Sequence, residues 1–164
     1  MFIKQSDLFW GLDKKFVASI MEASHKECYK KGTFLFREGD DADKFYILLK
    51  GRIRLNTGNR ETMVHTVCHA GETFGWSGLV GREHYSASAE CSEDVSLVSF
   101  EICDIHEIIK LDPANGMLFY KHLAYMLGNR LIKSYQMIHP ETYIHNQDTF
   151  GTGQMIQSEL ELES

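Results

Sequence analysis

The segment Ala70-Gly71-Glu72-Thr73-Phe74-Gly75-Trp76-Ser77-Gly78-Leu79, continued after a short loop by Tyr85-Ser86-Ala87-Ser88-Ala89, carries the most specific pattern in the sequence. It lies within a region, Cys28 to Phe100, in which short apolar or alternating runs are separated by turn residues. The clearest of these runs are 44–49, 52–55, 62–68 and 95–100. Several short strands at such spacing predict an antiparallel barrel or jelly-roll.

Two glycine-containing joints support this prediction. Gly51 separates two of the runs, where a tight hairpin needs a residue that accepts positive φ. Thr57-Gly58-Asn59-Arg60 marks the next hairpin. On the N-terminal side, apolar residues at helical spacing predict a helix, with Asp13 as the cap of its 14–23 stretch. These apolar residues are Phe9, Trp10, Leu12, Phe16, Val17, Ile20 and Met21.

Helical periodicity returns after the strands. A first helix is predicted over 102–111, and Asp112-Pro113 then restarts the helix with a cap and a proline at its first position. No further proline occurs before His139-Pro140, so the second helix has about 26 residues and a length of about 39 Å. It is too long to be covered by one small barrel, which favours pairing with a second copy. The predicted dimer interface consists of Tyr120, Ala124, Leu127, Gly128, Leu131 and Tyr135.

The predicted organisation is therefore a mainly β chain with flanking helices. Residues 1–111 form a double-stranded β-helix or jelly-roll (a β-roll) with an N-terminal helix, 112–138 form the long dimerisation helix, and 139–164 form an acidic tail. Glycine inside a helix costs nearly 1 kcal/mol relative to alanine. A close helix crossing at Gly128 would explain its presence.

Composition narrows the possible functions. The chain has 164 residues, 43% hydrophobic residues and a formal net charge of −6, which is typical of one globular domain and disfavours nucleic-acid binding by this chain alone. No run is long enough to cross a bilayer, and the N-terminus lacks the features of a signal peptide, so we expect a cytoplasmic protein. Four scattered cysteines, at 28, 68, 91 and 103, predict reduced and mostly buried thiols.

Four short motifs follow one another in the sequence: R-E-G-D at 37–40, K-G-R-I at 50–53, G-E-x-F-G at 71–75 and S-A-S at 86–88. In this order they resemble the cyclic-nucleotide-binding domain family, which includes catabolite-activator transcription factors, kinase regulatory subunits and gated channels. The resemblance covers roughly residues 5–138 and implies that 71–87 is a phosphate-binding cassette. Its turn opens into a short helix whose free N–H groups favour an anion.

The implied ligand-binding residues are Gly71, Glu72, Phe74, Gly75, Trp76, Ser77, Arg82, Tyr85, Ser86 and Ala87. Two of them depart from the family pattern. Trp76 stands where the family usually has a glutamate for the ribose, and Tyr85 stands where it has an arginine for the cyclic phosphate. A hydrogen bond to a charged group is worth about 1.5–3 kcal/mol, so binding of cAMP and cGMP is in doubt.

Three alternatives for this pocket remain open. Arg82 could swing toward the phosphate and replace the missing arginine, although an arginine on a polar loop is usually solvated. Trp76, Tyr85, Phe74 and His84 could shape a pocket for a flat or aromatic ligand. Alternatively, Trp76 and Tyr85 fill the old pocket and leave a structural domain.

Other constellations predict no chemistry. His65 and His69 would share one face of a strand that extends to 69, with Cys68 on the opposite face, so no metal site is expected. Ser77 lacks the G-x-S-x-G context of a hydrolase nucleophile, and we expect no enzyme. No resident cofactor is predicted; a haem-sensing relative exists in the wider family and keeps haem as a remote alternative.

The sequence therefore predicts a stand-alone regulatory module that senses a small-molecule effector, such as a cyclic nucleotide, and forms a homodimer. The alternative is a ligand-free dimerisation scaffold that retains only the fold. No winged DNA-binding module is expected after residue 138, because the 26 residues that follow contain no Lys or Arg.

Overall fold

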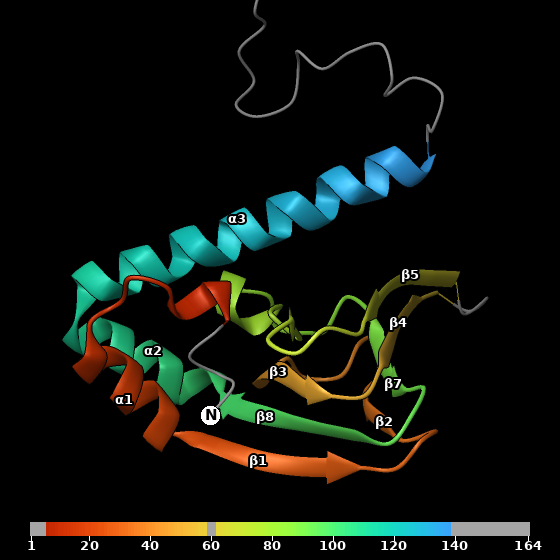
Figure 1. The fold of residues 1–164 in the computed structure, drawn as a ribbon, viewed down its shortest axis with the longest axis horizontal. Helices are drawn as coiled ribbons and strands as arrows, with labels where there is room; N and C mark the ends of the chain where they lie inside the picture. Colours follow the sequence, from red (N-terminus) through yellow and green to blue (C-terminus); the bar gives the residue numbers. More distant parts are fainter. Residues whose placement is uncertain (1–5, 59–61, 139–164) are drawn as a thin grey trace, which may run out of the picture. The chain divides into compact units, whose positions relative to one another are not determined.

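The computed structural model of the chain describes residues 6–58 and 62–138 (Figure 1). Two four-stranded antiparallel sheets form its centre, one in the order β1-β8-β3-β6 and the other in the order β2-β7-β4-β5. The strands are β1 (Ser24–Tyr29), β2 (Phe34–Phe36), β3 (Lys44–Lys50), β4 (Ile53–Thr57), β5 (Thr62–Val67), β6 (Thr73–Phe74), β7 (Ser88–Cys91) and β8 (Val95–Glu101). The helices are η2 (Asp7–Phe9), α1 (Lys14–Glu22), η3 (Gly78–Val80), α2 (Ile102–Leu111) and α3 (Pro113–Ile138). The predicted β-roll with flanking helices and a long C-terminal helix is confirmed.

The central pair of strands shows why the first sheet forms. β3 pairs with β8 so that Phe45 lies opposite Phe100 and Leu48 lies opposite Leu97, and all four side chains are buried. Burial of such side chains stabilises a fold by about 1.5–3 kcal/mol each. β3 is therefore buried on both faces: Leu48 and Leu97 belong to the cluster that also holds Tyr46 and Phe74, and Phe45 and Phe100 are buried outside that cluster. Strand β6, which belongs to the cassette segment, is attached to the other edge of β3.

Gly51 confirms the predicted hairpin between β3 and β4. Its φ is +98°, and a Cβ atom added there would lie 2.5 Å from the Asp94 main-chain oxygen. Only glycine satisfies both the positive φ and the close approach. The next hairpin joins β4 and β5 in antiparallel pairing; its residues Asn59 and Arg60 lie outside the described residues.

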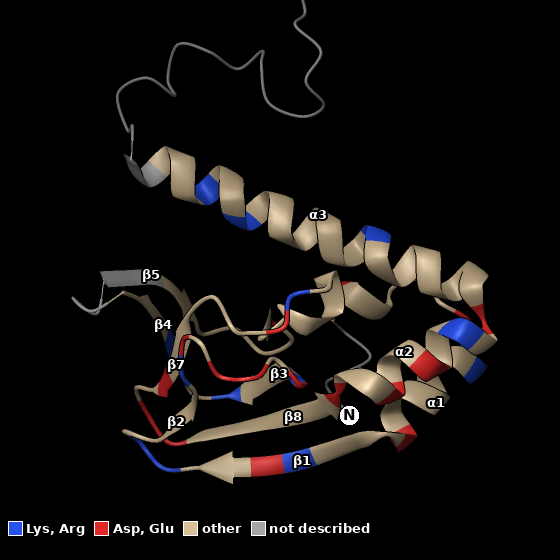
Figure 2. Ribbon diagram, turned by 180° about the vertical axis from the view of Figure 1, so that it is seen from behind, with Lys and Arg blue, Asp and Glu red and all other residues tan. Residues whose placement is uncertain are grey.

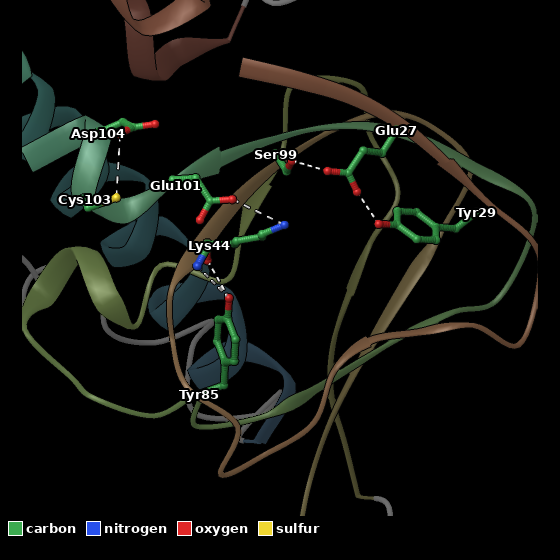
Figure 3. Close-up of polar contacts among 8 residues, drawn as sticks. All are labelled: Glu27, Tyr29, Lys44, Tyr85, Ser99, Glu101, Cys103 and Asp104. Carbon is green, nitrogen blue, oxygen red and sulfur yellow. Dashed lines mark hydrogen bonds and ion pairs between the residues drawn. The ribbon is translucent and has the colours of Figure 1, made fainter. Parts of the chain in front are cut away.

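The first sheet also contains a partly buried polar network (Figure 3). The Glu27 carboxylate on β1 accepts hydrogen bonds from the Ser99 hydroxyl on β8 and from the Tyr29 hydroxyl. Burial raises the pKa of Glu27, but these two donors, together with the charges of Lys44 and His25, outweigh it and leave the pKa below its ordinary value. The hydrogen bond from Tyr29 to Glu27, together with burial, raises the pKa of Tyr29 to about 12. The network therefore ties β1 to β8 with a charged carboxylate.

The N-terminal helix is shorter than predicted. The chain forms a separate 3-10 turn, η2, and then α1, because Gly11 adopts φ +73° and interrupts the helix between them. The Asp13 cap is confirmed, since its carboxylate accepts from the Lys15 amide at 2.7 Å. Strands β1, β6 and β7 were not predicted; β1 is an edge strand with four polar residues, and β6 has only two residues.

The C-terminal helices match their predicted bounds. Asp112 caps α3 by accepting from the Asn115 amide at 3.1 Å. Within the start of α3, a Cβ on Gly116 would lie 2.5 Å from Ile109, so this glycine allows α2 and α3 to approach closely. The chain divides into two compact units, 1–122 and 123–164. The predicted acidic tail, 139–164, lies outside the described residues.

Two further properties of the described residues bear on function. None of their helices combines the length and the apolar character that a bilayer-spanning segment requires. The prediction of mostly buried thiols is wrong, because Cys28, Cys68 and Cys103 are exposed and only Cys91 is buried. Cys28 lies on an edge strand, Cys68 follows the end of β5, and Cys103 lies in the first turn of α2.

Candidate ligand-binding cassette

The cassette begins with a tight turn between β5 and β6. The Glu72 amide donates to the His69 carbonyl at 3.1 Å, and Gly71, the third residue of this turn, has φ +90°. That conformation is the one a type II turn requires at its third position, where glycine is favoured. The Gly71 amide also donates to Leu48 on β3 at 2.8 Å, so the turn is fastened to the first sheet.

Glu72 stabilises this turn with its side chain. Its Oε2 atom accepts from the amides of Cys68 at 2.7 Å and His69 at 2.8 Å. Burial raises the pKa of Glu72, but the two amides and the neighbouring imidazoles outweigh it and lower the pKa below its ordinary value. The carboxylate therefore holds the chain that leads into the cassette.

Gly75 and Gly78 allow the cassette to pack closely on the rest of the roll. Gly75 has φ +72°, and a Cβ there would lie 2.8 Å from the Tyr46 ring. A Cβ on Gly78 would lie 2.1 Å from the Ala42 main-chain oxygen. Both glycines are buried, and the space beside them is filled by the chain's own atoms.

The helical turn in the cassette is η3, a 3-10 turn of three residues. The amides of Leu79, Val80 and Gly81 donate hydrogen bonds to carbonyls three residues earlier in this turn. The Arg82 amide donates to the Ser77 carbonyl at 3.1 Å. Within the described part of the chain, no hydrogen bond joins the amides of Gly75, Trp76, Ser77, Ser86 or Ala87 to another residue. The amides of Gly78, Glu83 and His84 likewise have no partner among the described residues, so the cassette keeps N–H donors at both of its ends and in its loop.

Tyr85 is part of the core. Its side chain is 4% exposed, and its ring stacks on Phe36 with the centroids 3.8 Å apart. Its hydroxyl donates to the Lys44 carbonyl at 2.7 Å and accepts from the Lys44 amide at 3.1 Å, as Figure 3 shows. Phe36 also stacks near Tyr46 and Phe74, so four aromatic rings fill this part of the roll.

The Tyr85 hydroxyl stays neutral near pH 7. Burial, as the largest cause, raises the pKa of Tyr85 to about 12. Burial and the neighbouring Tyr85 also raise the pKa of Tyr46. The position before Ser86 therefore offers no charge to a phosphate, in contrast to an arginine.

The remaining predicted residues differ in their access to solvent. Phe74 is fully buried and Ser77 is 4% exposed, whereas Trp76 and Ala87 are half-buried and Arg82 and Ser86 are exposed. His84 faces Asp41, with its Nδ1 atom 3.3 Å from the carboxylate. Of the predicted ligand-binding residues, Trp76, Arg82 and Ser86 thus have side chains at the surface, where Val80, Glu83 and His84 are exposed as well.

Sequence reasoning missed the residues that hold the cassette from outside. The Ala42 amide donates to the Glu83 carbonyl at 2.8 Å, and Lys44 binds the Tyr85 hydroxyl with its main chain. Main-chain contacts leave no residue-type signal in a sequence. Phe36 could have been found, because it ends an apolar run that directly precedes the R-E-G-D motif.

The expected geometry of the cluster at His65, Cys68 and His69 is wrong. Strand β5 ends at Val67, so the alternation of faces does not extend to Cys68 and His69. Both residues lie in the turn that follows, and the Cys68 Sγ atom is 3.5 Å from the His69 Nδ1 atom. The turn therefore brings together side chains that a continuous strand would separate.

Comparison with known proteins agrees with this architecture. The chain is 30% identical over 132 residues to the cyclic AMP receptor protein of Thermus thermophilus, an alignment that covers 79% of this chain and 59% of that protein. The chain thus spans less than two thirds of that relative. The regulatory domain of Toxoplasma gondii PKA, solved with cAMP, superposes with a TM-score of 0.60 and 26% identity, covering 65% of this chain and 41% of that one.

A cyclic nucleotide-binding domain from Methylobacillus flagellatus KT superposes with a TM-score of 0.73 over 93% of this chain and 83% of that one. At 19% identity, this likeness shows the fold alone. The sequence model of the cyclic nucleotide-binding domain matches residues 26–112, which include both sheets apart from the first two residues of β1. The chain belongs to the cyclic nucleotide-binding domain family.

Proposed function

We propose that this chain is a ligand-sensing regulatory module whose cassette binds a small anionic effector through main-chain amides, with low affinity for cAMP and cGMP. The observation that carries the proposal is the set of five cassette amides, at 75–77 and 86–87, without a hydrogen-bond partner among the described residues. A polar group left without a partner costs free energy when water is excluded, so such donors are suited to a ligand that accepts hydrogen bonds.

Low affinity for cAMP and cGMP follows from the two departures from the family pattern. Tyr85 is neutral and its hydroxyl is already bound to Lys44, so it contributes neither charge nor a free donor to a cyclic phosphate. Trp76 cannot accept a hydrogen bond from a ribose hydroxyl, because its indole nitrogen is only a donor. Arg82, which is exposed and lies three residues before Tyr85, is the cation in the cassette that could replace part of the missing positive charge.

Calorimetry tests this proposal directly. We expect cAMP to bind this chain at least about 10- to 100-fold more weakly than it binds the Thermus cyclic AMP receptor protein measured in parallel, and cGMP to bind this chain weakly as well. A thermal-shift panel of cyclic mono- and dinucleotides and other small phosphates should contain at least one stabilising ligand, since binding to the folded state raises stability by mass action. Affinity for cAMP equal to that of the Thermus protein would refute the altered cassette.

A ligand-free scaffold is the second candidate, and one observation favours it. The Tyr85 ring lies in the aromatic stack with Phe36, where it fills space inside the roll. If no member of the panel shifts the melting temperature at millimolar concentration, the scaffold is the better description.

Three exposed, unpaired cysteines suit a reducing compartment such as the cytoplasm under either proposal.

We also propose that α3 pairs with its counterpart in a second copy. Along the described part of the second unit, 123–138, Leu131 is 51% exposed and Tyr135 is 41% exposed, and with Ala124 and Gly128 they form a stripe at spacings of three and four. A Cβ on Gly128 would meet no atom within 4 Å, so room for a closely crossing helix remains there. Figure 2 shows that α3 carries Lys and Arg but no acidic residue.

Changing Leu131 to Asp should convert the dimer to a monomer in sedimentation experiments. A charge at the centre of an apolar helix pair must be desolvated without a partner, which costs several kcal/mol. Lys133→Asp is the matched control, because residue 133 lies about 200° around the helix from 131. A wild-type monomer at all concentrations, or equal effects of the two variants, would exclude pairing through this stripe.

A further inference from the structure

The turn between β5 and β6 gathers three side chains that commonly bind transition metals. Cys68, His69 and Glu72 each place one ligand atom so that all three lie within 4.8 Å of one another. The Cys68 Sγ to His69 Nδ1 distance is 3.5 Å, and the His69 Nδ1 to Glu72 Oε2 distance is 3.4 Å. We propose that this turn is a Zn²⁺ site formed by Cys68, His69 and Glu72.

Two of the three ligand separations fit one tetrahedral ion, and the third, between Cys68 Sγ and a Glu72 carboxylate oxygen, is no more than 4.8 Å. Zinc binds thiolate at about 2.3 Å and imidazole or carboxylate at about 2.0–2.2 Å, so neighbouring ligands of a tetrahedron lie about 3.3–3.7 Å apart. The two measured separations, 3.5 and 3.4 Å, fall in that range before any adjustment. A thiolate, an imidazole and a carboxylate together select a borderline metal such as zinc over Mg²⁺ or Ca²⁺, which prefer oxygen ligands alone.

The carboxylate is held in place by the chain. The amides of Cys68 and His69 both donate to Glu72 Oε2, which fixes the carboxylate relative to the two residues that carry the other ligands. Such supporting hydrogen bonds orient metal ligands in known sites. His65 lies next to the cluster, with its Nε2 atom 3.9 Å from Glu72 Oε1, and is the nearest candidate for a fourth protein ligand.

The site is open to solvent on one side. The His69 side chain is 80% exposed and the Glu72 side chain is 28% exposed, so the ion has an entry path and a water molecule can complete the tetrahedron. On binding, the Cys68 thiol loses its proton to solvent and the thiolate donates an electron pair to the metal. A metal there would hold the chain at 68–72, where the cassette begins.

The test uses the untagged full chain, first stripped with a chelator under reducing conditions. Titration with Zn²⁺ against a metal indicator should give one ion per chain, and Cys68→Ser or His69→Gln should weaken the affinity at least about 10- to 100-fold. Co²⁺ in place of Zn²⁺ should give a thiolate charge-transfer absorption that disappears in Cys68→Ser. Because both side chains are exposed, neither change removes core packing, and circular dichroism checks the fold.

Cys28→Ser and Cys103→Ser are the matched controls, since both cysteines are exposed and lie elsewhere in the chain. They should retain wild-type affinity and the cobalt absorption. Wild-type affinity no tighter than that of Cys68→Ser, or an equal loss in the controls, would overturn the site. The readouts do not involve the effector, so this result is independent of the function proposed for the cassette.

Discussion

Changing Gly78 to alanine should lower the free energy of unfolding by about 3 kcal/mol, one of the largest effects available from a single added methyl group in this chain. The added Cβ would lie 2.1 Å from the Ala42 main-chain oxygen and 3.1 Å from the Ile102 side chain. The Ala42 carbonyl cannot move easily, because the amide of the same residue is hydrogen-bonded to Glu83. Urea denaturation followed by tryptophan fluorescence measures the loss.

Gly81→Ala is the matched control for this effect. Gly81 also lies at the cassette and has φ +81°, but a Cβ there would meet no atom within 4 Å. Its substitution should cost only the strain of a left-handed alanine, about 1–2 kcal/mol. Gly78 itself has no positive φ, so a loss in Gly78→Ala no larger than that in Gly81→Ala would mean that the contact with Ala42 is not what requires a glycine at 78.

Residue type and spacing were sufficient to predict most of the fold. The bounds of α2 and α3 follow from apolar periodicity together with Asp112 and Pro113, which signal the restart of a helix. Gly51 is a reliable sign of the hairpin between β3 and β4, because its positive φ and the close Asp94 main-chain oxygen leave no room for any other residue there. Strand β1 escaped prediction because it is an edge strand of mostly polar residues, and such a strand carries little hydrophobic alternation.

The sequence was sufficient to recognise the cassette motif, but it did not show which cassette residues are buried and which remain accessible to a ligand. Its glycines were recognised, yet the space beside Gly75 and Gly78 is occupied by Tyr46 and Ala42, which come from other parts of the chain. The placement of Tyr85 was left open between a pocket wall and a filler, and only its packing on Phe36 and its bonds to Lys44 place it in the core. Contacts between distant residues decide such questions, and a single sequence does not contain them.

The turn at Cys68 illustrates the same limit in a different way. The alternation from 62 onward suggested a strand that continued to His69, which would have put the cysteine and histidine on opposite faces. The strand ends at Val67, because the Glu72 carboxylate accepts hydrogen bonds from the amides of the next two residues, Cys68 and His69. A carboxylate four residues away therefore ends the strand, a competition between side-chain and ladder hydrogen bonds that periodicity alone does not reveal.

Combining Trp76→Glu with Tyr85→Arg should raise the affinity for cAMP by about 100-fold or more. The arginine supplies a charge-assisted hydrogen bond to the cyclic phosphate, the glutamate accepts from the ribose, and each is worth about 1.5–3 kcal/mol. The change also removes the Tyr85 ring from its stack on Phe36 and frees space inside the roll. The variant should therefore be less stable without ligand and regain stability when cAMP is added.

The control for this gain is Trp76→Gln with Tyr85→Gln, which frees comparable space without adding either charge. If only the opening of the pocket matters, both double variants will bind cAMP more tightly than the wild-type chain; if charge matters, only the Glu and Arg pair will. Trp76→Glu alone changes a half-buried residue and leaves the Tyr85 packing intact, so it separates the ribose contribution from any loss of folding. Calorimetry on folded protein, checked by circular dichroism, decides between these cases. A folded Glu and Arg variant with no gain in affinity would show that positions 76 and 85 do not correspond to the ribose and phosphate positions of the family.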